Sequence, residues 1–149
     1  METYRLAFLS ICKPESLKTN YIQMKTVINT IDAPAPIGPY SQAVIANGFL
    51  FLSGQVAINP ENGELTQSSI KEETHQVMRN IKAVLIEASY KFEDVVKTTI
   101  FLSDMSLFAE VNEVYGSYFD RDFPARETVA VKGLPKGVNV EISMTAYKA

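Results

Sequence analysis

The most regular pattern in the chain lies at residues 138–147, where the sequence reads VNVEISMTAY. Every second position from Val138 to Ala146 is apolar, and Glu141 is one of the polar residues between them. Because successive side chains of a β-strand point to opposite faces of the sheet, this alternation predicts a strand with one buried face. The stretch therefore predicts a sheet that is covered on one side, with Glu141 on the other side.

Two amphipathic helices are expected to cover the buried side. From Ser69 to about Ala88, apolar and small residues recur every three or four positions, the spacing of a helix with one buried face. Ser68 or Ser69 can cap its start. A second helix is expected at about residues 106–119, with Asp104 or the first residue of that range as its N-cap. The exposed side of the first helix is assigned polar residues that include Glu73, Gln76 and Asn80.

Shorter segments complete the predicted sheet. Asn47-Gly48 is a strong hairpin signal, because both residues accept the positive φ of a two-residue turn, and it joins strands expected at residues 42–46 and 49–53. Further strands are expected at residues 95–103 and 128–131, the first with Val96, Thr98, Ile100 and Leu102 on one face. The order hairpin, helix, strand, helix, two strands favours an α+β sandwich with both helices on one face of a mixed sheet. The other face would carry Val, Thr, Phe and Tyr side chains with little cover, which indicates self-association.

Composition and charge narrow the class of protein. The 149 residues are 46% hydrophobic and 21% charged, as in an ordinary globular domain. Residues 1–23 show no clear period, and we interpret them as an N-terminal extension, disordered or arising from an upstream start, ahead of a domain at residues 24–149. No run approaches the roughly 18 apolar residues of a membrane span, so we expect a cytoplasmic protein. The net charge of −3 disfavours nucleic acid as the main partner.

Common catalytic motifs are missing from the sequence. His75 is the single histidine, and Cys12 is the single cysteine. No second ligand or triad motif accompanies them, which excludes the usual zinc sites and Ser-His-Asp triads. No glycine-rich phosphate-binding loop occurs either. We therefore expect neither a zinc site nor a phosphate-binding loop, and we expect His75 at the surface or boundary of its helix.

Four features remain as candidates for function. They are Gly38-Pro39-Tyr40-Ser41-Gln42, Ser53-Gly54-Gln55, Phe123-Pro124-Ala125-Arg126 and Glu141. Taken singly, each has a simpler explanation, namely a turn, a bulge, a surface arginine or a solvated strand residue. Taken together and in this order, they resemble the Rid (reactive intermediate deaminase) family, also called the endoribonuclease L-PSP family. The resemblance covers about residues 24–149 and is most specific from Pro124-Ala125-Arg126 through Leu134-Pro135 to Val140-Glu141-Ile142.

The resemblance implies a fold, an assembly and a reaction. It implies a chorismate-mutase-like α/β sandwich that forms a homotrimer, with its sites in clefts between subunits. It also implies hydrolysis of reactive 2-imino and 2-enamino acids, such as 2-aminoacrylate or 2-iminobutyrate, to 2-keto acids and ammonia. This reaction protects PLP enzymes and needs no cofactor.

The resemblance also assigns roles to residues of this chain. Arg126 resembles the arginine that binds the substrate carboxylate through two parallel N–H donors, and Glu141 resembles the acid that positions the attacking water. Tyr40, Ser53 and Asn112 correspond to residues that line the pocket. Thr128, where many members carry cysteine, is included among the substrate-binding residues. The central expectation is that Arg126 and Glu141 converge in one walled gap.

The chain departs from the family pattern at Glu127. This residue places a negative charge next to Arg126, but in a strand it is expected to point to the opposite face.

Two alternative functions are considered. One is an endoribonuclease or translation inhibitor, which the acidic pI disfavours, and the other is a non-enzymatic ligand-sensing or chaperone-like trimer. The presence of Arg126 favours catalysis over the second alternative.

Overall fold

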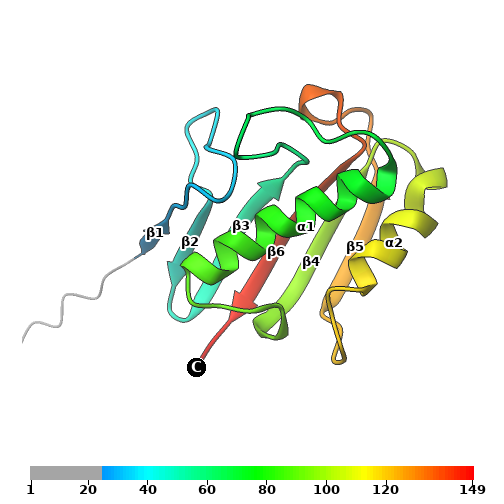
Figure 1. Cartoon of the computed structure of the whole chain (residues 1–149). Coiled ribbons are helices and arrows are strands. Elements are labelled where there is room, and N and C mark those ends of the chain that lie inside the picture. The colour runs from blue at the N-terminus through cyan, green and yellow to red at the C-terminus, as the bar shows by residue number, and fades with distance from the viewer. Residues whose placement is uncertain (1–24) are drawn as a thin grey trace, which may run out of the picture.

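The structure of the protein is a computed structural model that describes residues 25–149. This part of the chain forms one six-stranded sheet with two α-helices on one face (Figure 1). The extension expected at residues 1–23 lies outside the described residues. The elements are β1 (Thr26–Ile28), β2 (Ala43–Ala46), β3 (Phe49–Gln55), α1 (Ile70–Glu87), β4 (Val95–Leu102), α2 (Phe108–Gly116), β5 (Ala125–Ala130) and β6 (Val140–Tyr147), with 3-10 turns at Phe92–Asp94, Met105–Leu107 and Pro135–Gly137.

The sheet has the strand order β1-β2-β3-β6-β4-β5. Its neighbours are antiparallel except β4 and β5, which run parallel, so the predicted mixed sheet is confirmed. The last strand, β6, lies between β3 and β4, and its apolar residues Val140, Ile142 and Met144 are at most 3% exposed. The hairpin between β2 and β3 turns at Asn47 and Gly48, whose φ angles are 48° and 76°. The alternation that suggested the fold therefore belongs to the centre of the sheet.

Helix α1 runs across the sheet and begins as expected, with the side chain of Ser69 accepting a hydrogen bond from the backbone N–H of Glu72 (Figure 1). The assignment of Glu73, Gln76 and Asn80 to its exposed side is wrong, because all three are buried. Two loops at the same end of the sheet, one after β3 and one before β6, contact this side of the helix. Asn80 donates to the carbonyls of two loop residues that follow β3, and Glu73 accepts two hydrogen bonds from Asn139, which precedes β6.

The elements at the β5 edge differ in detail from the sequence-based expectation. In β4, Val95 is buried while Val96 is 44% exposed, because the register with β6 shifts at this point. The placement of Val96 on the same face as Thr98 is therefore wrong. Strand β5 begins at Ala125, earlier than expected, so that Arg126 lies within the strand. Helix α2 is shorter than expected and follows a 3-10 turn that Asp104 caps.

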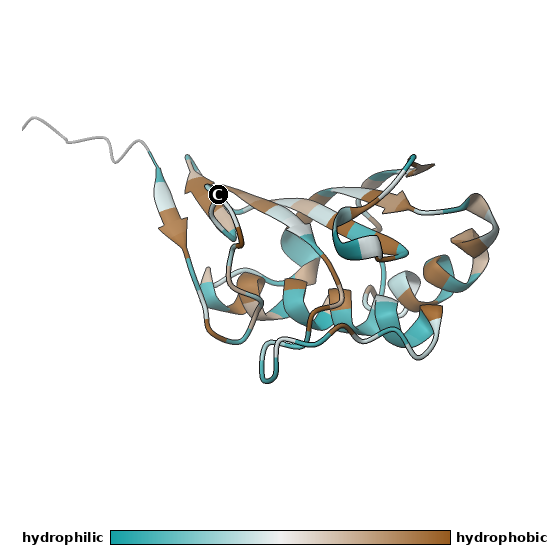
Figure 2. Cartoon of the chain, turned by 90° about the horizontal axis from the view of Figure 1, so that it is seen from above, coloured by the Kyte–Doolittle hydropathy of each residue, from teal (hydrophilic) through white to brown (hydrophobic). Residues whose placement is uncertain are grey.

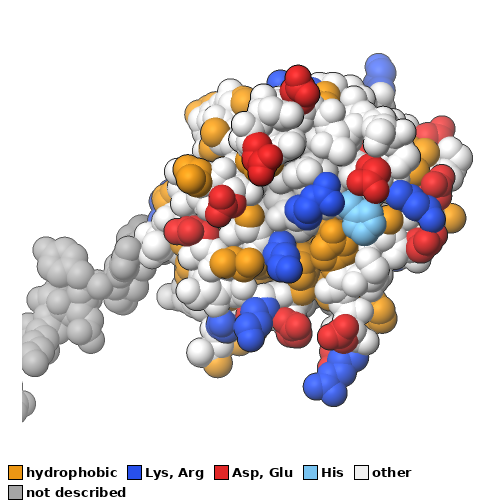
Figure 3. Space-filling model, viewed as in Figure 1, with side chains coloured by type: hydrophobic (Ala, Val, Ile, Leu, Met, Phe, Trp, Pro, Cys, Tyr) orange, Lys and Arg blue, Asp and Glu red, His pale blue; other side chains and the backbone are white. Residues whose placement is uncertain are grey.

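The face of the sheet opposite the helices is uncovered in the described part of the chain, as predicted (Figure 2). Three aromatic residues form a cluster there, with Phe49 40%, Phe51 51% and Tyr147 42% exposed. The ring centroids of Phe49 and Tyr147 are 4.7 Å apart. The helix side carries charges of both signs around an apolar patch (Figure 3). Neither helix of residues 25–149 has the length and apolar character needed to cross a membrane.

Candidate active site

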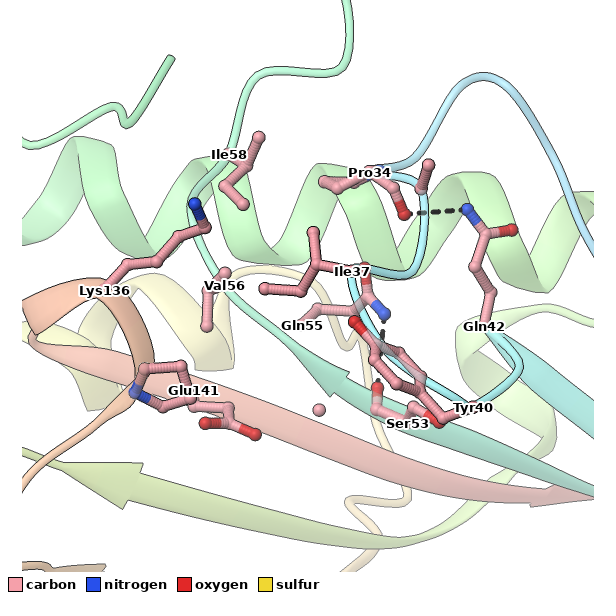
Figure 4. A pocket seen from close by; sticks show the side chains of 13 residues that line it. Pro34, Ile37, Tyr40, Gln42, Ser53, Gln55, Val56, Ile58, Lys136 and Glu141 are labelled. Carbon is pink, nitrogen blue, oxygen red and sulfur yellow. Dashed lines mark hydrogen bonds between the residues drawn. The ribbon is translucent and has the colours of Figure 1, made fainter. Parts of the chain in front are cut away.

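A cavity of about 330 Å³ at one end of the sheet contains three of the predicted site residues, Tyr40, Ser53 and Glu141. Glu141 enters it from β6, Ser53 from β3 and Tyr40 from the loop before β2 (Figure 4). The rest of the wall is mostly apolar, with two amide side chains and one cationic side chain: Pro34, Ala35, Ile37, Gln42, Gly54, Gln55, Val56, Ile58, Pro135 and Lys136. The cavity can therefore hold a small molecule with a short apolar side chain next to a carboxyl group of the protein.

A β-bulge brings Ser53 and Gly54 to this cavity. Leu52 pairs with Met144 and Gln55 with Ile142, so β3 advances by one residue more than β6 between these pairs. Leu52 and Gln55 are both buried, at 4% and 5% exposure, and the extra residue leaves Ser53-Gly54 at the cavity. The simpler explanation of Ser-Gly as a bulge is thus correct, and the bulge itself exposes both residues to the cavity.

Glu141 is half-buried at the end of β6 that borders the cavity. Removal of its carboxyl group from water raises its pKa above the ordinary range, with no contribution from a neighbouring charge. A carboxyl group with a raised pKa is a stronger base once it has lost its proton. The pKa of Glu141 is therefore shifted in the direction that favours a role as proton acceptor.

The hydroxyl group of Ser53 is already committed as a donor. Its Oγ donates to the backbone carbonyl of Ser41 over 2.7 Å, so its lone pairs remain to accept a hydrogen bond within the cavity. Tyr40, by comparison, is 49% exposed at the cavity mouth. Ser53 can therefore orient a water molecule or an N–H group by accepting, while Tyr40 lies where an incoming ligand would pass.

Gln42 holds the loop that carries Tyr40, and sequence reasoning missed this role. Its side chain is 1% exposed, and its Oε1 accepts from the backbone N–H of Thr30 at 2.7 Å. Its Nε2 donates to the carbonyls of Thr30, Ala33 and Pro34. An amide at the first position of a predicted strand, next to a Gly-Pro turn, was the available signal. Its partners lie 8 to 12 residues away, and the sequence alone did not locate them.

Arg126 lies at a second cavity, of about 400 Å³, between β5 and α2. Its Nη1 donates to Oδ1 of Asn112 over 2.8 Å. Its Cζ lies 5.0 Å from the centre of the Tyr115 ring and 5.8 Å from that of Phe108, so both contacts are cation–π interactions. Helix α2 therefore fixes the plane of the guanidinium, and Asn112 acts on Arg126 rather than standing free.

Within one chain, the side chains of Arg126 and Glu141 point to opposite faces of the sheet. Arg126 pairs with Thr98, which pairs with Met144, so Arg126 points to the helix-covered side. Glu141 is three residues before Met144 in the same strand and points to the other side. The structure thus brings Tyr40, Ser53 and Glu141 together, and Asn112 with Arg126, but one chain does not bring the two groups together.

The two residues after Arg126 have separate surroundings. Glu127 points to the uncovered face, where its carboxylate binds the ammonium of Lys97 and the hydroxyl of Thr99. The hydrogen bond from Lys97, followed by that from Thr99, lowers the pKa of Glu127. The Oγ1 of Thr128 is buried and has no hydrogen-bond partner among the described residues. Glu127 thus points away from Arg126, as expected, and Thr128 keeps a free hydroxyl on the Arg126 side of the strand.

His75 has a structural environment. Its Nδ1 lies 3.0 Å from the hydroxyl of Tyr118, and the two rings are tilted against each other between α1 and the end of α2. This matches the expected boundary position. The residue lines neither of the two cavities described above.

Comparisons with known proteins identify the family of this chain. A family model described as endoribonuclease L-PSP matches residues 30–148. A RutC family protein of Pyrococcus horikoshii is 53% identical over 125 residues, which cover 84% of this chain and 99% of the relative. The human 2-iminobutanoate/2-iminopropanoate deaminase is 42% identical over 125 residues, which cover 84% and 91%.

Solved structures show the same fold. A Rid family protein of unknown function from Yersinia pestis superposes with a TM-score of 0.81 at 48% identity, covering 83% of this chain and 99% of that one. TdcF from E. coli, solved with bound serine, gives a TM-score of 0.80 at 35% identity with the same coverage. The fold and sequence therefore define a small α+β domain of the endoribonuclease L-PSP type. The chain belongs to the Rid family, which confirms the resemblance seen in the sequence.

Proposed function

We propose that this protein hydrolyses 2-imino acids and their 2-enamino tautomers, such as 2-iminobutanoate and 2-aminoacrylate, to 2-keto acids and ammonia in the cytoplasm. The observation that carries the proposal is a carboxyl group of raised pKa, Glu141, in a small and mostly apolar cavity. The human relative that bears the deaminase name is 42% identical over most of this chain. The imine carbon is already electrophilic, so the reaction requires positioned groups and a proton acceptor.

Glu141 is the proposed base for the attacking water. Its carboxylate takes a proton from water as the oxygen adds to C2 of the imine, and the imine nitrogen gains a proton. The resulting carbinolamine then loses ammonia as C2 forms the keto group, so one water molecule is consumed and one ammonia leaves. Ser53 accepts a hydrogen bond from the water or the nitrogen, and the phenol of Tyr40 closes the mouth of the cavity.

Arg126 is the proposed partner of the substrate carboxylate. The guanidinium has five N–H donors, and its hydrogen bond to Asn112 uses one of them. The contacts with Tyr115 and Phe108 hold its plane, so a fork of two parallel donors remains for the two carboxylate oxygens. The free hydroxyl of Thr128 is a further donor on the same side of β5. Together these residues would fix one end of a small acid.

The complete site is proposed to form between two copies of the chain in a homotrimer. Arg126 and Glu141 lie on opposite faces of one sheet, so a substrate that contacts both needs one group from each of two chains. The uncovered face carries exposed aromatic residues and supplies a surface for such an assembly. Sedimentation at micromolar concentration tests this point, and a monomer that remains active would contradict it.

The direct test follows the loss of 2-iminobutanoate generated in place by a PLP-dependent threonine dehydratase. We expect wild type to accelerate its conversion to 2-ketobutyrate, while Glu141→Gln loses about 10²- to 10⁴-fold of that rate. Glu87→Gln, at the exposed end of α1, is the matched control and should resemble wild type. Equal rates for wild type and Glu141→Gln would overturn the proposal.

Ribonuclease activity is the second candidate, because the matching family model is described as an endoribonuclease. The net charge of −3 argues against binding a phosphate backbone. Incubation of the same purified variants with a labelled single-stranded RNA separates the two functions. RNA cleavage that persists in wild type and disappears in Glu141→Gln, without any effect on the imine, would favour the second candidate.

A further inference from the structure

Gly54 lies closer to the Glu141 side chain than any other residue type would allow. A Cβ atom built on Gly54 would overlap Oε1 of Glu141 and would lie 2.8 Å from its Cδ and 3.0 Å from its Cγ. Ordinary van der Waals contact begins at about 3.5 Å between carbon atoms. The space that a methyl group would occupy at position 54 is therefore filled by the carboxyl group of Glu141.

The backbone gives no separate reason for glycine at this position. The φ angles of Gly48, Gly63 and Gly137 are positive, a conformation that favours glycine, but Gly54 is not among these residues. It belongs to the bulge of β3, where the chain is extended and alanine fits the backbone. The only atoms within 3.0 Å of the added methyl group belong to Glu141, and they form the far end of a flexible side chain. A larger residue at position 54 would displace this carboxyl group first and leave the sheet in place.

We propose that Gly54 is a positioning residue for the deamination reaction, because the absence of a side chain there lets the Glu141 carboxylate lie against β3 beside Ser53. This inference rests on the proposed function and deepens it. It assigns to the Ser-Gly bulge a specific purpose: one residue of the bulge offers a hydroxyl oxygen, and the next leaves the space in which the base is held. The bulge thereby sets where the attacking water can be activated.

The test is the single substitution Gly54→Ala, assayed with 2-iminobutanoate generated in place. A displacement of about 1 Å in a reacting group can cost on the order of 100-fold in rate, so we expect kcat to fall by about that factor while KM changes little. The melting temperature should remain within a few degrees of wild type. Gly133→Ala is the matched control, because a Cβ there meets no atom within 4 Å, and it should keep full activity.

The pH profile supplies a readout that a purely structural role would not change. In wild type, burial raises the pKa of Glu141. The alanine methyl group would move the carboxyl group toward the open cavity and its water, so its pKa should fall. The acid limb of the kcat profile for Gly54→Ala should therefore shift to lower pH, although the maximal rate is lower. An acid limb identical to that of wild type, combined with wild-type kcat, would overturn the inference.

A double substitution keeps the inference testable if Gly54→Ala folds poorly. Glu141→Ala removes the atoms that would collide, so adding Gly54→Ala to it should cost neither stability nor residual rate. Additive losses in the double variant would show that Gly54 acts through something other than Glu141, and would overturn the inference. If Glu141→Gln itself leaves imine hydrolysis unchanged, the proposed function fails. If Glu141→Gln is impaired and Gly54→Ala is not, only the inference fails.

Discussion

At the scale of single residues, the planar guanidinium of Arg126 can donate two parallel hydrogen bonds to a carboxylate, which the ammonium of lysine cannot do. Arg126→Lys keeps the positive charge but removes the two parallel donors and the stacking on Tyr115. Since a hydrogen bond to a charged group contributes about 1.5 to 3 kcal/mol, we expect kcat/KM for 2-iminobutanoate to fall roughly 10- to 150-fold, mainly through KM. Steady-state kinetics measure this change.

Arg121→Lys is the matched control for that substitution. The Arg121 side chain is 89% exposed, and its one ion pair, to the neighbouring Asp122, is equally exposed. Its replacement should leave both kinetic constants unchanged. If Arg126→Lys were as active as Arg121→Lys, the substrate would not depend on a bidentate contact at position 126.

The carboxyl group of Glu141 makes a second prediction, which concerns pH. A base works when it is deprotonated, and burial raises the pKa of Glu141. We therefore expect kcat to rise with pH through that raised pKa, and the rise should be absent in Glu141→Gln. A rate that stays flat from mild acid to neutral pH in wild type would show that Glu141 does not supply the base.

The same pKa shift affects stability with a defined sign. Folding raises the pKa of Glu141, so the folded state holds the proton more tightly than the unfolded state. Its contribution to stability is present below the unfolded pKa and is lost as pH rises through the folded pKa. Glu141→Gln should consequently be at least as stable as wild type at neutral pH, and its urea midpoint should depend less on pH. A variant clearly less stable at neutral pH would contradict this sign.

At the scale of elements, helix α1 and the start of β6 are joined by one buried carboxylate. Glu73, 1% exposed, accepts from the backbone N–H of Asn139 at 2.6 Å and from its Nδ2 at 2.9 Å. Ser103 binds Asn139 from the other side, through its backbone N–H and its Oγ. These contacts hold the residue that lies two positions before Glu141. The first turn of α1 thus helps to place the end of β6 that carries Glu141.

Glu73→Ala would leave the N–H of Asn139 without its partner in a partly buried contact. A fully buried group of this kind costs about 1 to 3 kcal/mol, so we expect the free energy of unfolding in urea to fall by up to that amount. Glu73→Gln keeps an acceptor for the backbone N–H and should lose less. The adjacent Glu72→Ala is the control, because that side chain is exposed. Equal stability of Glu73→Ala and Glu72→Ala would mean that the contact with Asn139 contributes nothing.

Sequence periodicity predicted best the helix and the strand that each bury a single face. The alternation of β6 and the apolar stripe of α1 are local consequences of strand and helix geometry, and both are confirmed. The burial of Glu73 and Asn80 was not predictable in this way, because it depends on loops about 20 to 65 residues distant along the chain. The shift at Val96 was missed because a bulge changes which face a residue occupies without changing the sequence period.

At the scale of the whole molecule, the strand register separates Arg126 from Glu141 within one chain. The sequence indicated both residues and the resemblance assigned their roles, but their placement on opposite faces became clear only from the strand register. A parallel β4–β5 pair at the sheet edge is what turns Arg126 toward α2. No sequence pattern specified that β5 would be the edge strand, since strand order depends on long-range pairing.

Subunit mixing tests the proposed sharing of the site. Arg126→Ala and Glu141→Ala chains should each be inactive alone. When they are co-expressed in equal amounts and assemble at random, about one site in four should receive an intact Arg126 from one chain and an intact Glu141 from its neighbour. Roughly a quarter of wild-type activity should therefore return, measured against each variant expressed alone. No recovery in a verified mixed assembly would mean that each site belongs to a single chain.

The placement of Arg126 and Glu141 on opposite faces of the sheet also has a consequence for how the proposed activity depends on protein concentration. If each complete site requires residues from two chains, a folded monomer has no complete site and no activity. Specific activity should then decline on dilution below the dissociation constant of the assembly. A cell that makes half as much of the protein would, near that threshold, lose more than half of the proposed deaminase activity.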